Sequence, residues 1–526
     1  MSTTAFFTIF ALFTGCICAL QPGFKARITP KGLRFLSELG IRELKEEISK
    51  IKIPDYSGSH HIKIIGTVDY SLTNMHVTSF NIPSASITTK ANIGVTISAG
   101  GLSAAMHGDW QYRIHDIFHI HDHGSFDVSF SSVSISLTVR IGMDSTGRPT
   151  VRSQDSDCNF YVGDAHVRFH GGKSWLYNLF HRKIESKLKS SLNSKICEVV
   201  VNLVNTKLAE QVSTLKTVIS ISGTAEIDYS LLSPPIFNSS LTTSHKGEVY
   251  QIGHHTEAPF RIPIIPRDDD MSRMVLMWMT DFVPNSAGYV LHTTGFFQYN
   301  VTQDKIPSDI KVSLNTSDFA VQFAIPQIAK LYPNRMMQVN LNTTSPPKLS
   351  ITSDKVGANV NGDITAYIIQ PNKSLTYLFT LGATLNVSAS IGFRKADLTW
   401  NSSYVSADLK LLHTAIDDFK IDSLRSVVQL VCRVYIIPEI NKRGEKGVPV
   451  PSFRDYAFVN PVVEQKEGLL KIGTDIRYQK NWLLDPYEES STPSYNAQNE
   501  GTYSTESSLQ GEESSVMPLD WENSAA

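Results

Sequence analysis

Apolar residues first recur at helical spacing between residues 29 and 54. Thr29 is placed as an N-cap and Pro30 as the first helical residue, where the missing proline N–H costs nothing. Pro54 ends the pattern. The sequence therefore predicts an amphipathic helix from residue 30, whose apolar positions are Leu33, Leu36, Leu44, Ile48 and Ile51.

From residue 62 to residue 141 the pattern changes to alternation, which is typical of strands with one buried face. Phe126, Val128 and Phe130 share one side of the chain. A break at Ser131 and Ser132 indicates a β-bulge. After it, one face is formed by Val133, Ile135, Leu137, Val139 and Ile141. We expect long antiparallel strands with apolar residues inward and Ser or Thr outward.

A second amphipathic helix is predicted over residues 174–205. Its apolar positions step by four: Leu176, Phe180, Ile184, Leu188 and Leu192. After a Pro-containing connection the same order of strands, helix and strand returns. The later helix, within residues 422–442, has one apolar side formed by Leu424, Val427, Val431 and Val434. The interpretation is an α+β protein with an N-terminal domain at 21–248, a linker at 249–266 and a C-terminal domain at 267–481.

The two ends of the chain differ in amino-acid composition from the rest. Residues 1–20 form an apolar run of signal-peptide length, which predicts secretion, with or without storage in granules. No later stretch approaches the length of a membrane-spanning helix. Residues 482–526 are rich in Ser, Glu, Asn and Tyr, so we expect a disordered acidic tail.

Cysteines and glycosylation triplets agree with secretion. Without Cys16 and Cys18, three cysteines remain, which allow one internal disulfide at most. Cys432 lies in an apolar helical context and is interpreted as a buried, inert thiol. Glycosylation acceptor triplets occur at Asn238, Asn300, Asn315, Asn342, Asn372, Asn386 and Asn401. None precedes Asn238, which fits an early surface that stays bare in order to touch a partner.

The chain has few features that indicate catalysis or nucleic-acid binding. The formal net charge of −2 gives no reason to expect a nucleic acid as partner. The usual hydrolase, zinc-protease, Cys-x-x-Cys and phosphate-loop motifs are missing from the sequence, which makes an enzyme less plausible.

The histidine-rich segment at residues 110–126 is the main candidate for chemistry. If it is extended, Ile114, Phe118, Ile120 and Phe126 face inward. The opposite face then carries Arg113, His115, His119, His121 and His123. Three interpretations stay open: an ordinary solvent-facing strand, a cationic patch that charges as pH falls, and a metal site.

Several ordered motifs resemble the family of bactericidal/permeability-increasing protein and lipopolysaccharide-binding protein. They are "PGFKARITPKGL" (22–33), "IKIPDYSG" (51–58), "GSFDVS" (124–129), "LFHRKIES" (179–186), "NSKICE" (193–198), "DYSLLSPP" (228–235), "NSAGYV" (285–290) and "PEINKRGEKGVPVP" (438–451). The resemblance implies a two-domain boomerang in which each domain is a twisted, barrel-like antiparallel sheet wrapped on a long helix, with a shared central sheet. It also implies a disulfide between Cys158 and Cys197.

The resemblance further implies two kinds of site. Each domain would hold phospholipid in an apolar pocket between helix and sheet, with candidate residues Leu33, Leu36, Leu176, Phe180, Ile184, Leu424, Val427 and Val431. The tip of the first domain would contact lipopolysaccharide phosphates, with candidates His60, His61, Lys63, Arg113, His115, His119, His121 and His123. Strongly cationic relatives carry lysine where this chain has Thr67, and acidic residues interleave the second tip segment at Asp109, Asp116 and Asp122. Phosphate attraction at neutral pH should therefore be weaker here.

The leading hypothesis is a secreted, non-enzymatic protein of innate defence against Gram-negative bacteria. Its partners would be lipopolysaccharide, phospholipids and the bacterial outer membrane surface, and it would act as a monomer without a cofactor other than bound phospholipid. One alternative is a phospholipid carrier without bactericidal activity. Another is a metal-dependent enzyme built on the histidine strand.

Overall fold

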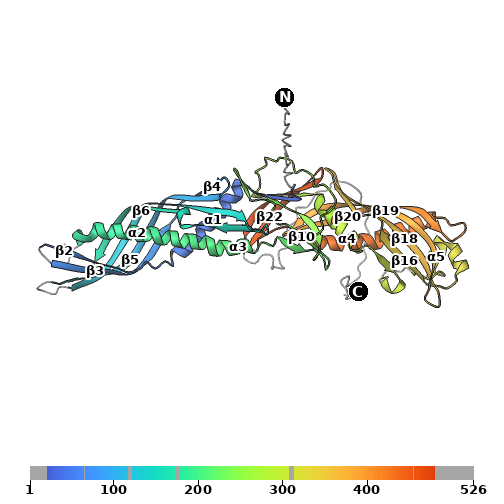
Figure 1. The fold of residues 1–526 in the computed structure, drawn as a ribbon, viewed down its shortest axis with the longest axis horizontal. Coiled ribbons are helices and arrows are strands. Elements are labelled where there is room, and N and C mark those ends of the chain that lie inside the picture. Colours follow the sequence, from blue (N-terminus) through green and yellow to red (C-terminus); the bar gives the residue numbers. More distant parts are fainter. Residues whose placement is uncertain are drawn as a thin grey trace, which may run out of the picture.

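A long, narrow shape with sheets along its whole length characterises the protein (Figure 1). The computed structural model describes residues 21–63, 66–115, 121–172, 177–306, 313–453 and 455–479. The expected signal peptide and acidic tail lie outside these residues. The chain forms two elongated halves on either side of a central sheet, as the resemblance implied.

The N-terminal half is a curled antiparallel sheet with two helices. Its strand order is β2-β3-β5-β6-β7, with β4 paired to β5 and β8 to β6. The strands are β2 (Tyr56–Ile62), β3 (Gly66–Asn81), β4 (Ser86–Lys90), β5 (Gly94–Ile114), β6 (His121–Met143), β7 (Pro149–Arg152) and β8 (Cys158–His170). The helices are α1 (Pro30–Ile48) and α2 (Tyr177–Leu203), and α2 continues through a π-helical turn at Val204–Leu208 into α3 (Ala209–Ser213).

The predicted alternation in β6 is confirmed, including its bulge. Ser132 has a φ of 56°, and the register of β6 against β5 shifts between the pairs Val133 opposite Leu102 and Phe130 opposite Ala104. On both sides of the bulge the apolar positions from Phe126 to Val139 are at most 7% exposed and share one core with Ile184, Leu188, Leu192 and Ile196 of α2, whereas Ile141 is only half-buried. The helical stripe at steps of four is therefore also confirmed where α2 is described.

The start of α1 is fixed by a cap that reaches into the other half. Thr29 Oγ1 accepts a hydrogen bond from Gly32 N at 3.4 Å and donates one to Arg273 O at 2.7 Å. A Cβ atom at Gly32 would lie 2.5 Å from Met274 O, so only glycine allows this close approach. The predicted N-cap is thus correct, and it also joins α1 to the strand that opens the C-terminal half.

The central sheet combines strands from both halves in the order β11-β12-β1-β14-β23-β22. Strand β1 (Phe24–Ile28) pairs with β12 (Leu241–His245) on one side and with β14 (Val275–Thr280) on the other. The remaining members are β11 (Ile236–Phe237), β22 (Tyr456–Lys466) and β23 (Leu469–Tyr478). A small sheet beside it contains β13 (Glu248–Gln251), β10 (Ala225–Asp228) and β9 (Val218–Ser220).

The connection between β13 and β14 contains no helix or strand, but its end is fastened to the central sheet. Lys471 on β23 is 5% exposed and its Nζ lies 2.9 Å from Asp268 Oδ2 and 2.8 Å from Asp270 Oδ2. Arg27 donates to the carbonyl oxygen of Asp268 at 2.5 Å. A buried ammonium needs such partners, because an unpaired charge inside a protein is costly.

The C-terminal half repeats the plan of the first. Its sheet has the order β15-β16-β18-β19-β20-β21, with β17 paired to β18. The strands are β15 (Tyr299–Val301), β16 (Met337–Thr343), β17 (Lys348–Ile351), β18 (Val356–Ile369), β19 (Leu375–Arg394), β20 (Asp397–Thr414) and β21 (Val448–Pro449). The helices are α4 (Phe282–Thr293), α5 (Phe319–Ala324), α6 (Pro326–Leu331), α7 (Asp422–Val431) and α8 (Ile437–Lys446).

One predicted helix position in this half is wrong. Val434 was expected on the apolar side with Leu424, Val427 and Val431, but it is 55% exposed, whereas Cys432 is buried. The cause is a π-helical turn at Cys432–Ile436 between α7 and α8, which adds a residue to the turn and rotates the following side chains. The burial of Cys432 raises the pKa of its thiol, which agrees with the predicted inert cysteine.

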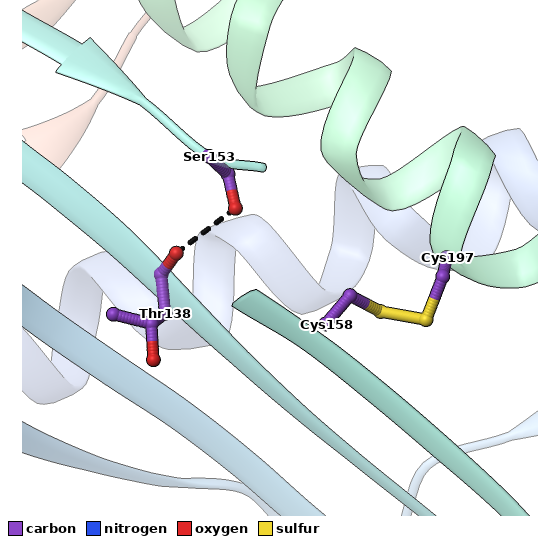
Figure 2. The surroundings of a disulfide bond; sticks show 4 residues. All are labelled: Thr138, Ser153, Cys158 and Cys197. Carbon is purple, nitrogen blue, oxygen red and sulfur yellow. Dashed lines mark hydrogen bonds between the residues drawn. A yellow bond between two sulfur atoms is a disulfide. The ribbon is translucent and has the colours of Figure 1, made fainter. Parts of the chain in front are cut away.

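The disulfide between Cys158 and Cys197 joins the first residue of β8 to α2, as Figure 2 shows. Next to it, Ser153 Oγ donates to the Thr138 carbonyl oxygen at 2.9 Å and so holds the end of β7 against β6. Asn205 then accepts from Ser153 N at 2.9 Å and donates to Ser153 O at 3.0 Å. The long helix is therefore tied to the sheet edge both covalently and by hydrogen bonds.

Removing the disulfide should destabilise the N-terminal half. The bond closes a loop with a sequence separation of 39, and a native bridge of this kind contributes about 2–4 kcal/mol. We expect Cys158→Ala/Cys197→Ala to lower the free energy of unfolding by that amount in denaturant titrations. Cys432→Ala, which removes a thiol without breaking a bridge, is the control. Equal effects of the two changes would contradict this prediction.

A buried histidine in the central sheet makes stability depend on pH. His245 on β12 lies opposite Phe24, donates from Nδ1 to Tyr229 O at 2.7 Å and accepts at Nε2 from Thr243 Oγ1 at 2.8 Å. Burial lowers the pKa of His245 to about 4. The unfolded chain therefore binds one more proton than the folded chain between about pH 6.5 and pH 4.

The free energy of unfolding should accordingly fall as pH decreases through this window. His245 alone accounts for a slope of about 1.4 kcal/mol per pH unit. We expect His245→Gln to reduce the slope by that amount in denaturant titrations at pH 7.0, 6.0 and 5.0. His413→Gln, at an exposed histidine, should leave the slope unchanged. Parallel pH profiles for the wild type and His245→Gln would refute the assignment.

Candidate functional site

The two predicted tip segments are adjacent at the far end of the N-terminal half (Figure 1). Asp69 on β3 pairs with Arg113 on β5, and Arg113 pairs in turn with His121 on β6. The backbone N–H of His115 donates to Thr67 O at 3.0 Å. The β2–β3 and β5–β6 hairpins therefore bring the two sequence-distant segments side by side.

The histidine-rich segment is a hairpin and not one continuous strand. Strand β5 ends at Ile114 and β6 begins at His121, so the assumption of a single extended segment is wrong. The predicted faces nevertheless hold for the described residues, because antiparallel pairing keeps opposed residues on one side of a sheet. Ile114 and Phe126 are buried. The exposed residues are Arg113, His115, His121 and His123, whereas Asp116, Phe118, His119 and Ile120 lie outside the described residues.

The grouping of His60 with His61 needs correction. His60 lies opposite the buried Val68 and therefore points to the inner face of the sheet. His61 lies opposite Thr67 on the outer face, with its Nδ1 3.3 Å from Thr67 Oγ1. Neighbouring strand residues face opposite ways, so only His61 joins the outer surface. Lys63, just after β2, is exposed.

Carboxylates on the outer face bind several of the imidazoles. His115 Nε2 lies 2.5 Å from Asp69 Oδ2. Further from the tip, Asp127 contacts His107 Nδ1 at 2.7 Å through Oδ1 and His170 Nε2 at 2.8 Å through Oδ2. The hydrogen bonds from His107 and His170 lower the pKa of Asp127, and those from Ser59 and His115 lower the pKa of Asp69. Both carboxylates therefore stay ionised in mild acid.

The outer face carries more histidines than the sequence reasoning identified. Among the described residues eight share it, from five different strands: His61, His76, His107, His115, His121, His123, His166 and His170. His76, His107, His166 and His170 were missed because they form no dense run: His76 and His107 are the single histidines of β3 and β5, and His166 and His170 lie four residues apart in β8. The available signal was their parity relative to the buried residues of each strand, but strand pairing was needed to place them together.

This surface combines imidazole groups with carboxylates that pair with several of them. At neutral pH the permanent cations among the outward-facing residues include Arg113 and Arg168. The described residues contain no group of three or more His, Cys, Asp or Glu side chains arranged to hold a metal ion.

The inside of the N-terminal half is closely packed where it is described. Leu33 and Ile184 are 5% and 4% exposed and belong to the same core. Leu36 instead packs against the core beside the central sheet. Leu176 lies outside the described residues, and the same holds for the side chain of Phe180. A pocket of about 240 Å³ lies between α1 and β4, lined by Pro30, Leu33, Arg34, Ala85, Ser86, Ile87, Thr89 and Ser239.

Side chains on the inner sheet face of the C-terminal half are less completely buried than those of the N-terminal half. The inward row of β19 is entirely apolar, yet its middle members Ala383, Leu385, Val387 and Ala389 are only half-buried. On β18, their partners Val360 and Ala358 are half-buried as well. Buried cores lie at both ends of this row, one with Ile391 and Phe393 and the other with Leu381. An apolar sheet face is thus left partly uncovered between two packed regions.

Helix α7 lies over one end of this apolar row. Leu424 and Val427 pack against the same core as Ala383 and Ile364, but they remain half-buried, as does Val431. In the N-terminal half, the matching row of β6 from Phe126 to Val139 is at most 7% exposed and shares one core with α2. Leu424, Val427 and Val431 thus lie beside the half-buried apolar row, and their contact with lipid stays a prediction.

The glycosylation acceptors that the sequence predicts are compatible with the structure. Asn315 is half-buried, and the other six acceptor side chains are exposed. Glycosylation itself stays a prediction. In the described part of the chain, no helix is both long enough and apolar enough to cross a membrane.

Comparison with known proteins decides the family. Two family models match consecutive parts of the chain: "LBP / BPI / CETP family, N-terminal domain" at residues 32–215 and "LBP / BPI / CETP family, C-terminal domain" at residues 219–478. The chain belongs to the LBP/BPI/CETP family. The suspected resemblance and the predicted fold class are therefore confirmed.

The chain aligns with relatives in this family over nearly their full length. A bactericidal permeability-increasing protein from Sebastes schlegelii is 34% identical over 88% of this chain and 96% of that protein. A lipopolysaccharide-binding protein from Bos taurus is 28% identical over 89% of this chain and 96% of its own. A crystal structure of lipopolysaccharide binding protein superimposes with a TM-score of 0.59 at 27% identity, covering 88% of this chain and 100% of that one.

Proposed function

We propose that this chain is a secreted lipid-binding protein, without enzymatic activity, that recognises bacterial lipopolysaccharide or a similar anionic glycolipid. Family membership and the names of its relatives support this proposal. Antibacterial action against Gram-negative bacteria would follow from contact with their outer membrane. The protein would work as a monomer, with phospholipid as its bound ligand.

The proposal rests on the residues that are exposed on the outer face of the N-terminal tip. Arg113, His121 and His123 lie there on two paired strands with exposed side chains. Guanidinium and protonated imidazole groups donate charge-assisted hydrogen bonds to phosphate oxygens. The nearby carboxylates oppose this attraction at neutral pH, so binding to phosphate should depend on how many imidazoles are protonated.

Binding to lipopolysaccharide should therefore strengthen as pH falls below about 6.5. We expect higher affinity at pH 5.5 than at pH 7.4 in a direct binding measurement on immobilised lipopolysaccharide. His121→Ala/His123→Ala should weaken binding about thirtyfold at pH 5.5, since each of the two cations near an anionic surface contributes about 1 kcal/mol, and should change little at pH 7.4. His254→Ala/His413→Ala, at exposed histidines away from the tip, is the matched control. Equal affinity at both pH values in the wild type would rule out the imidazole contribution.

We further propose that the C-terminal half holds a phospholipid by its acyl chains. The half-buried apolar row of β18 and β19 supports this, because each methylene that leaves water contributes about 0.8 kcal/mol. The pocket beside α1, at about 240 Å³, is below the usual range of about 300–1,000 Å³ for small-molecule sites. The C-terminal interior is therefore the stronger candidate.

Native mass spectrometry of the purified protein should show a bound mass of phospholipid size. Ala383→Phe places a large ring into the apolar row and should lower the occupied fraction severalfold. Thr384→Phe, one residue away on the opposite face of β19, should leave it unchanged. Lipid-free wild-type protein, or equal loss in both variants, would overturn the assignment. A vesicle-to-vesicle transfer assay and a bacterial killing assay on the same samples separate carriage from antibacterial action.

A further inference from the structure

Predicted glycosylation acceptors gather on one sheet, the sheet of the C-terminal half (Figure 1). Each of the strands β15, β16, β19 and β20 carries one of them, and they are Asn300, Asn342, Asn386 and Asn401. All four side chains are exposed. We call these four residues the sheet acceptors. The other three predicted acceptors lie between strands, at Asn238, Asn315 and Asn372.

Two of the sheet acceptors face outward on β19 and β20. Asn386 lies between Leu385 and Val387 of the inward apolar row, so its own side chain points to the outer face. Asn401 lies opposite Ser390, which is four residues after Asn386 and therefore has the same orientation. Opposed residues of antiparallel strands share one side of a sheet, so Asn401 also faces outward.

The sheet acceptors on β15 and β16 lie on the same outer face. Asn342 is opposite Asp363 of β18, whose neighbour Ile364 packs inside. Asn300 is opposite Asn340, which lies two residues before Asn342 and so points the same way. All four sheet acceptors are therefore on the side of the sheet that is turned away from the half-buried apolar row.

The register gives the spacing of the sheet acceptors. Followed across the paired strands onto β19, they fall at Thr380, Gly382, Asn386 and Ser390. With a rise of about 3.3 Å per residue, neighbouring acceptors are about 7–13 Å apart along the strand direction. They form an oblique line from the edge strand β15 to β20, so glycans on them would cover the middle of the outer face.

The outer face around the sheet acceptors has little charge of its own. The strands β15, β16, β18 and β19 contain two charged residues between them, Asp363 and Arg394. Soluble surfaces usually carry about 25–35% charged residues, and weakly charged ones tend to associate. The strand β15 is also an edge of its sheet, and a free edge can pair with another chain. A glycan is bulky and solubilising, so it would oppose both kinds of contact.

Hydrogen bonds around Asn386 are compatible with a glycan on this residue. Thr384 Oγ1 donates to Asn361 Oδ1 at 3.0 Å, and Asn361 Nδ2 donates to Asn359 Oδ1 at 3.0 Å. Asn359 Nδ2 then donates to Asn386 Oδ1 at 2.9 Å. This chain of hydrogen bonds uses Oδ1 of Asn386, whereas a glycan is attached through Nδ2. The folded sheet therefore keeps its side-chain contacts when Asn386 is modified.

We propose that N-linked glycans on the sheet acceptors cover the outer face of the C-terminal sheet and prevent it from associating with further copies of the chain. The proposal rests on the proposed secretion, because these glycans are attached in the secretory pathway. It is independent of lipid recognition, since the apolar row lies on the other side of the sheet. The histidine-bearing strands of the N-terminal half contain no acceptor, so their outer face stays uncovered.

Peptide mass spectrometry of protein secreted by an animal cell line tests the cover directly. At least three of the four sheet acceptors should carry a glycan on most molecules. Secreted protein with fewer occupied sheet acceptors would overturn the glycan cover and leave the proposed secretion intact. Protein that stays in the cytosol would overturn the proposed secretion, and the glycan cover with it.

Sedimentation velocity at pH 7.4 measures the effect on association. Asn342→Gln/Asn386→Gln removes two glycans from the outer face, and the variant should associate at a severalfold lower concentration than the wild type. Asn238→Gln/Asn372→Gln, at two exposed acceptors between strands, is the matched control and should behave like the wild type. Equal association of the two variants would refute the proposal.

A second measurement does not depend on how well a variant folds. Folded Asn238→Gln/Asn372→Gln is treated with an endoglycosidase that leaves one sugar on each modified asparagine, and its circular dichroism is recorded before and after treatment. With an unchanged spectrum, association should again begin at a severalfold lower concentration. Treated protein that stays as monomeric as the untreated sample would contradict a shielding role of the glycans.

Discussion

The structure depends on one constraint, which is that a long curled sheet with one apolar face must find a cover for that face. In both halves the cover is a helix laid along the sheet, and the free energy comes from apolar area removed from water. In the N-terminal half the cover fits closely, and residues such as Phe126 and Leu188 are almost fully buried. In the C-terminal half α7 covers the same kind of face incompletely, and Leu385 stays half-buried. The same plan therefore gives a closely buried sheet face in one half and a less completely buried apolar sheet face in the other.

The outer faces of the two halves differ as well. The N-terminal sheet presents histidines and aspartates in neighbouring strands, such as His107 and His170 around Asp127. The C-terminal half presents predicted glycosylation acceptors on β19 and β20, together with aromatic residues at its distal end. The strands β2 and β3 of the histidine-rich face and the helix α5 with its exposed Phe319 and Phe323 lie at opposite ends of the elongated molecule (Figure 1).

Much of the fold could be predicted from local pattern, because alternation and helical spacing report directly on burial. The bulge at Ser132 and the cap at Thr29 are examples. The exposure of Val434 could not be predicted, since a π-helical turn leaves no distinct mark in the spacing of apolar residues. The opposite orientations of His60 and His61 were predictable from the two-residue period of a strand. The pairing of His76 with His107 could not be predicted, because it depends on the register between β3 and β5.

The position of β1 has a consequence for biosynthesis. This strand leaves the ribosome among the first, but its two neighbours, β12 and β14, follow more than 200 residues later, and β23 closes the sheet beside β14 near the end of the described chain. Contacts between such distant segments form slowly. A nascent chain would therefore carry the unpaired strand β1 through most of translation, and termination before β23 would leave the apolar strand β14 as an aggregation-prone edge. Premature stop codons close to residue 469 should thus be as harmful to folding as early ones.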